Sequence, residues 1–147
     1  MTDRGVSSAF GYVLTLAIAA LLVSGLLLAG GNFVGDSRER VIRQELEVIG
    51  QHVASNIEMA DRMVLAGDNT STVTLNQSFS QRVTGVTYQI ELVEEEDPYL
   101  RLNATDPDIS VLVNVDNSTA VRESYADGGE VAVVYDESED ELVMQNG

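Results

Sequence analysis

The sequence predicts an α+β protein in which a long N-terminal helix packs on a C-terminal antiparallel β-sheet. Three observations predict this class. Residues 6–35 carry no charged side chain, residues 42–64 repeat apolar side chains at helical spacing, and residues 68–147 alternate apolar and polar side chains between polar turns. The 147 residues leave room for an anchor and one modest domain.

The charge balance is strongly acidic. Eight basic residues, all of them arginine, face 24 acidic residues, for a net charge of −16. Such self-repulsion is tolerated where concentrated salt screens it, so the acidic, lysine-free composition favours a halophilic source. An ordinary acidic protein from a moderate environment is the alternative. The same charge argues against a nucleic-acid partner, because that binding needs cations to neutralise phosphates.

The first element is an apolar helix over residues 6–30. It is longer than the roughly 20 residues that cross a hydrocarbon core, and too long for an ordinary secretory signal. The polar residues 1–5 precede it, which inverts the order of a normal signal peptide. Small residues at four-residue steps lie on common stripes of this helix, where they would permit close helix–helix packing. These are Gly11, Thr15 and Ala19, and then Gly25 and Ala29.

The N-terminus resembles the class III signal of archaeal type IV pilins. Residues 3–7 read Asp-Arg-Gly-Val-Ser, and Gly11 opens a long Leu/Val/Ala-rich run. The resemblance covers about the first 30 residues, and its motif is moderately specific. It departs from the family at Ser8, where proline is usual, and residues 9–10 are Ala-Phe. These departures favour a minor or pilin-like subunit over a major one.

The resemblance implies a set of partners. A prepilin peptidase would cut between Gly5 and Val6, and the apolar helix would then hold the subunit in the membrane and later pack against other pilin subunits. A plain uncleaved transmembrane tether is the alternative. Counting Arg38, Arg40 and Arg43 after the span would place the C-terminus inside. We expect it outside, because class III signals translocate the domain that follows them.

The next element, over residues 31–67, is a flexible joint followed by an amphipathic helix. Glycines and Asn32 make residues 30–35 poor in helix formers, and Asp36 with Glu39 forms an N-cap and N3 pair. Gly67 marks the C-terminal end. Between them runs one apolar stripe, made of Ile42, Leu46, Ile49, Val53, Ile57, Ala60 and Val64.

The remaining residues, 68–147, form the predicted β-domain. Alternating patterns predict strands over residues 86–92, 109–115, 131–135 and 142–144, with shorter candidates at 73–75 and 100–102. Their close spacing, with no helical window between them, indicates antiparallel meandering pairing. A long helix laid on such a sheet is also the pilin-like architecture that the resemblance implies.

Motifs for chemistry are few. Four N-x-S/T sequons follow the span, and their asparagines are candidates for N-glycosylation: Asn69, Asn76, Asn103 and Asn117. Members of the archaeal pilin family are often glycosylated. The chain has no cysteine and a single histidine, His52, which we expect at the helix surface. We therefore expect no catalytic residues, no metal site, no cofactor and no small-molecule substrate. Acidic runs at residues 94–97 and 136–141 are interpreted as a solvated surface.

The sequence thus predicts a structural subunit and not an enzyme. In this hypothesis a pilin-like protein is anchored in the cell membrane, exposes its C-terminal domain outside, and enters a cell-surface filament. An adhesion pilus, an archaellum-like filament and a pseudopilin system remain open. The alternative is a membrane-anchored extracellular binding or sensory domain that does not polymerise.

Overall fold

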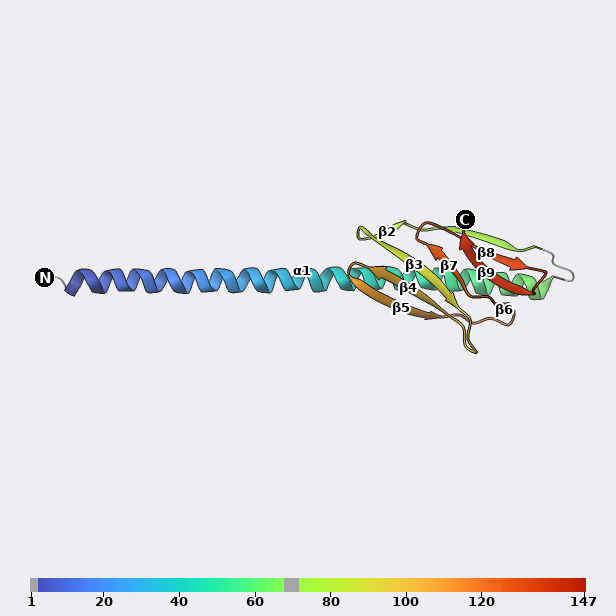
Figure 1. Cartoon of the computed structure of the whole chain (residues 1–147), viewed down its shortest axis with the longest axis horizontal. Helices are drawn as coiled ribbons and strands as arrows, with labels where there is room; N and C mark the ends of the chain where they lie inside the picture. Colours follow the sequence, from blue (N-terminus) through green and yellow to red (C-terminus); the bar gives the residue numbers. More distant parts are fainter. Residues whose placement is uncertain (1–2, 68–71) are drawn as a thin grey trace. The chain divides into compact units, whose positions relative to one another are not determined.

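The computed structural model describes residues 3–67 and 72–147. The chain divides into two compact units, Met1–Arg38 and Glu39–Gly147. Helix α1 (Asp3–Ala66) contributes to both, and all the strands of the described residues follow it in the second unit (Figure 1). The fold is therefore α+β, with an N-terminal helix and a C-terminal domain of curled, largely antiparallel β-structure, as the sequence predicts.

Helix α1 differs from the prediction in one respect. Residues 31–35 are helical, so the new helix start expected at Asp36 is wrong. Glycine weakens a helix by only about 1 kcal/mol per residue, and no proline is present to remove a backbone donor. Propagation from strongly helical neighbours outweighs this cost, because no new nucleus is needed. The predicted end is confirmed, since α1 stops at Ala66 and the N–H of Gly67 donates to the carbonyl of Val64 at 3.3 Å.

The described strands form two sheets. One has the order β1-β8-β9-β6, and the other has the order β2-β3-β4-β5 with β7 also paired to β3. The bounds are β1 Thr74–Ser78, β2 Arg82–Val83, β3 Val86–Val93, β4 Tyr99–Thr105, β5 Asp108–Asn114, β6 Ala120–Val121, β7 Ser124–Asp127, β8 Glu130–Asp136 and β9 Glu141–Asn146.

All six predicted strand regions contain strands, but the meander is only partly correct. Sequential antiparallel pairing holds for β3, β4 and β5, and for β8 with β9. By contrast, β1 pairs with the distant β8, β7 returns to β3, and β6 lies parallel to β9. The short strands β2, β6 and β7 were not predicted, because two to four residues carry too little alternation to register as a pattern.

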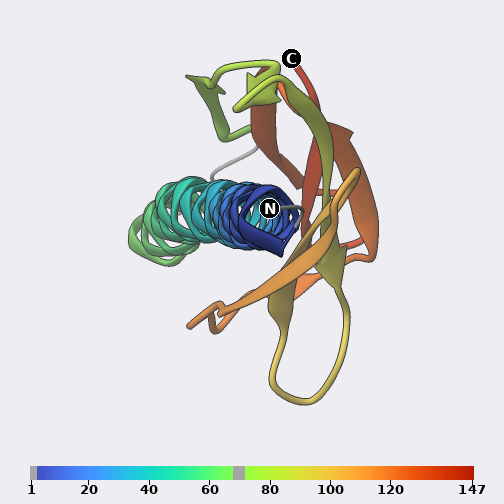
Figure 2. The ribbon, with the colours of Figure 1, turned by 90° about the vertical axis from the view of Figure 1, so that its left-hand side faces the viewer.

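The core of the second unit lies between the apolar stripe of α1 and the inner faces of the strands, which curve along one side of the helix (Figure 2). Five stripe residues are fully buried or nearly so, and Ile49 and Val64 are partly buried against the same cluster. The five are Ile42, Leu46, Val53, Ile57 and Ala60. Burying each large aliphatic side chain contributes about 1.5–3 kcal/mol, so this stripe holds helix and sheets together.

Candidate functional site

The N-terminal part of α1 exposes an apolar surface. Large side chains between Phe10 and Val34 keep half or more of their area exposed. Within the part of the chain that the structure describes, α1 is the one helix long and apolar enough to cross a membrane. Its most apolar 18-residue window has a mean hydropathy of 2.5 and is 0% buried. By length and composition, this segment can anchor the chain in a membrane.

The residues predicted to act in this segment all lie in α1. The peptide bond between Gly5 and Val6 falls within its first turns. The small residues form an open stripe, because a Cβ added at Gly11 or Gly25 would meet nothing within 4 Å. The Thr15 hydroxyl donates to the Gly11 carbonyl at 2.8 Å, so the polar atom of this stripe is satisfied inside the helix. Ala19 and Ala29 are also exposed.

The structure separates three of the four sequons by accessibility. Asn69 lies outside the described residues. Asn76 is exposed on β1, and Asn103 is half-buried on β4 beside a polar hollow. The Asn117 amide is engaged, since its Nδ2 donates to the Thr119 carbonyl at 2.7 Å. Its Oδ1 is buried without a hydrogen-bond partner among the described residues. Among the three sequons that the structure describes, Asn76 is thus the one whose amide is best presented for modification.

Asp61 connects α1 to the segment between β5 and β6. Its side chain, only 5% exposed, accepts hydrogen bonds at Oδ1 from the N–H groups of Ser118 at 3.1 Å and Thr119 at 2.6 Å. A buried carboxylate needs such donors, because an unpaired charge in the interior is costly. No sequence pattern predicts this clamp. The only available signal was an acidic residue directly after Ala60 at the edge of the apolar stripe.

Gly50 is a place where side chains of the sheet approach the backbone of α1 closely. A Cβ at this position would lie 2.7 Å from Val113 Cγ2 and 2.8 Å from Leu102 Cδ1. A larger residue would force these side chains of β4 and β5 to shift. The role of this glycine is therefore packing, and its sequence signal was a lone glycine within a strongly helical stretch.

The outer face of the sheet carries a row of polar and aromatic side chains. Arg101 donates to Glu91 Oε2 at 2.8 Å and to the Tyr99 hydroxyl at 2.8 Å. The hydrogen bond to Glu91 is the main reason that the pKa of Arg101 is raised. On the neighbouring strand β7 the Tyr125 hydroxyl donates to Glu123 Oε1 at 2.6 Å, and this bond raises the pKa of Tyr125 to about 12. These hydrogen-bonded pairs fix the orientation of the side chains on the outer face of the sheet.

The second acidic run is tied into local hydrogen bonds. Asp136 Oδ1 accepts from the backbone N–H and the hydroxyl of Ser138, which lowers the pKa of Asp136. Asp140 accepts from the Tyr135 hydroxyl at 2.6 Å. Among residues 3–67 and 72–147, no group of three or more His, Asp or Glu side chains could hold a metal ion. The ionisable side chains of the described residues are thus dispersed and do not converge on one site. The exposed surfaces are therefore the more informative features.

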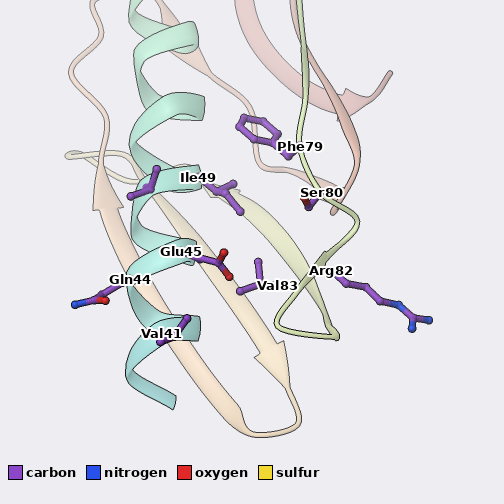
Figure 3. Close-up of a pocket in the computed structure, with 9 residues that line it drawn as sticks. Val41, Gln44, Glu45, Ile49, Phe79, Ser80, Arg82 and Val83 are labelled. Atoms are coloured by element: carbon purple, nitrogen blue, oxygen red, sulfur yellow. The ribbon is translucent and has the colours of Figure 1, made fainter. Parts of the chain in front are cut away.

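An open groove of about 400 Å³ lies within the second unit, between α1 and the segment that leads into β2. We call it the α1–β2 groove. Its apolar lining consists of Val41, Val48, Ile49, Phe79 and Val83. His52, which we expected at the helix surface, is exposed on α1, and its ring lies 6.4 Å from that of Phe79. Figure 3 shows the groove, with Glu45 and Val83 facing each other across it.

Comparison with known proteins gives a family match. Neither the curated proteins nor the solved structures contain a match to this chain. A family described as of unknown function, DUF7266, matches residues 1–145, a range that includes both the apolar segment and the sheet domain; the chain belongs to this family.

Proposed function

We propose that this protein is a pilin-like structural subunit, which a prepilin peptidase cleaves between Gly5 and Val6 and which assembles into a type IV pilus-like filament or a related pilin machine. Its activity is association. The apolar part of α1 holds the subunit in the membrane before assembly and packs against other subunits afterwards, while the acidic β-domain faces a saline medium outside the cell.

One observation carries this proposal. The N-terminal part of α1 is an exposed apolar segment, and the C-terminal part of the same helix packs against the sheet domain. The exposed segment has no hydrophobic partner within the described chain, so it needs lipid or other protein chains to cover it. A helix that only tethers a domain to the membrane needs lipid, and no other helix, around its apolar side chains. The open small-residue stripe in addition permits close approach by another helix.

The family match adds support of another kind. It extends from residue 1 through the apolar segment to residue 145, so the N-terminal residues and the sheet domain are matched together. This is expected if the apolar helix contributes to the function of the protein. The resemblance of residues 3–7 to a class III signal then gives the order of events, with cleavage first and assembly second.

The test is the N-terminal residue of the mature protein, measured by mass spectrometry of membranes and of filaments sheared from native cells. We expect a chain that begins at Val6 and is present in the sheared fraction. A Gly5→Val variant, in which the peptidase loses its small residue before the cut, should remain uncleaved in the membrane. An intact wild-type N-terminus found only in membranes would contradict the proposal and favour a tethered ectodomain that binds or senses without polymerising.

A further inference from the structure

The polar hollow beside Asn103 is open on the outer face of the sheet. Its volume of about 530 Å³ lies within the range of about 300–1,000 Å³ that small-molecule sites occupy. Gln89 on β3 stands opposite both Asn103 on β4 and Asp127 on β7, so these polar side chains form one row across the sheet. Thr87, two residues before Gln89, stands opposite Arg82 on β2 and begins a second row on the same face. Four strands thus bring polar side chains to one hollow.

The side chains of the hollow have hydrogen-bonding capacity that the rest of the described chain does not use. The Gln89 Nε2 donates to Asp127 Oδ1 at 3.4 Å, and the Tyr88 hydroxyl donates to the Ser80 carbonyl at 2.8 Å. Among the described residues, no other side-chain hydrogen bond or ion pair involves the polar lining, which also includes Gln81, Arg82, Thr87, Asn103 and Thr105. Amides and hydroxyls both donate and accept hydrogen bonds, so this lining suits a ligand with many hydroxyl groups.

The charge of the hollow limits the class of ligand. Arg82 is the one basic side chain in the described lining, and it extends away from α1 (Figure 3). It forms no ion pair within the described parts of the chain, although the chain has 24 acidic residues. A guanidinium pairs with a carboxylate through two parallel hydrogen bonds. Because Asp127 balances the charge of Arg82, the hollow favours a ligand with a single carboxylate over a polyphosphate.

An exposed aromatic ring lies beside the hollow on the same face. Tyr125 is two residues before Asp127 on β7, and 49% of its surface is exposed. Its hydroxyl donates to Glu123 Oε1, which holds the ring in place. An aromatic ring offers a flat apolar surface to the C–H groups of a sugar ring. A saccharide longer than one unit therefore fits this face, with one unit in the hollow and the next over Tyr125.

We propose that the polar hollow binds a saccharide that contains a sugar acid. Arg82 pairs with the carboxylate of the sugar acid. Gln89 and Asn103 exchange hydrogen bonds with its ring hydroxyls, and Asp127 accepts from a further hydroxyl. Two sources supply this chemistry: a glycan carried by the sequon of Asn103 and Thr105, whose side chains border the hollow, or a saccharide from outside the chain. The site goes beyond the proposed function, because a filament subunit and a tethered ectodomain can both carry it.

The first experiment titrates D-glucuronate and D-glucose, separately, into the isotopically labelled full-length chain in detergent micelles. The chain is produced in a host that does not N-glycosylate proteins, and binding is followed by NMR. We expect the side-chain amide signals of Gln81, Gln89 and Asn103 to shift and saturate with glucuronate. Glucose lacks the carboxylate, so it should bind about tenfold more weakly. Shifts that do not saturate, or equal affinities for the two sugars, would overturn the site.

The second experiment removes the guanidinium. Arg82→Gln should lower the affinity for glucuronate about tenfold, to that for glucose, and leave the affinity for glucose unchanged. Arg62→Gln is the matched control, because it makes the same change of charge on α1, where the Arg62 side chain is 71% exposed. It should bind both sugars as the wild type does. An equal loss in the two variants would indicate a general effect of charge and would contradict the pairing of Arg82 with the carboxylate.

The third experiment separates the two sources by using chain purified from native cells. A sugar acid found on Asn103 by glycopeptide mass spectrometry, with free glucuronate bound only after Thr105→Ala removes the sequon, would assign the hollow to the chain's own glycan. An unmodified Asn103 in a native chain that binds glucuronate would assign it to a saccharide from outside. A native chain that binds no glucuronate although Asn103 is unmodified would overturn the site, and processing between Gly5 and Val6 would be unaffected.

Discussion

Replacing Asp61 tests whether the connection between α1 and the β5–β6 segment stabilises the domain. Asp61→Ala removes two hydrogen bonds to a charged acceptor, and each such bond contributes about 1.5–3 kcal/mol. Because the N–H groups of Ser118 and Thr119 would lose their acceptor, we expect the free energy of unfolding to fall by about 3–5 kcal/mol. Asp61→Asn keeps an oxygen acceptor without the charge, and we expect a loss of about 1–3 kcal/mol.

The measurement is urea unfolding of the full-length chain in detergent micelles with concentrated KCl, followed by circular dichroism. Domains of this size have a stability of about 5–15 kcal/mol, so both losses are measurable. Asp97→Ala is the matched control, because Asp97 is exposed in the loop between β3 and β4, and it should change stability by no more than about 0.5 kcal/mol. An Asp61→Ala loss equal to that of the control would refute the clamp.

Three further predictions test packing, ionisation and modification. Gly50→Ala should lower the free energy of unfolding by about 1–3 kcal/mol although alanine favours helix, because its Cβ would overlap side chains of β4 and β5; thermal unfolding checks this. Tyr125 should ionise near pH 12 by phenolate absorbance, and Glu123→Gln should lower that pKa. Since the folded pKa is raised from 10.0, this contribution to stability is complete below pH 10.0 and is lost as pH rises through about 12. Mass spectrometry of glycopeptides from native filaments should find sugar on Asn76 and none on Asn117; an unmodified Asn76 beside a modified Asn117 would contradict the accessibility argument.

Local patterns predicted the parts of the fold that local physics controls. The stripe from Ile42 to Val64 repeats at the helical period, so its burial follows once any apolar surface covers that face. The long apolar run before Gly30 predicted a segment able to span a membrane. The strands β3 and β5 alternate clearly enough to be located from sequence. Local signals failed at residues 31–35, where weak helix formers are carried along by the helix on either side.

Tertiary structure alone decided which distant residues meet. The pairing of β1 with β8 joins segments more than fifty residues apart, and nothing in the pattern of either strand identifies its partner. The same holds for Asp61 with the N–H groups of Ser118 and Thr119, and for Gly50 beneath β4 and β5. A sequence period states which face of an element is apolar, because that depends on backbone geometry. It does not state which surface covers that face, because this depends on the packing of the whole chain, and the α1–β2 groove belongs to that second class.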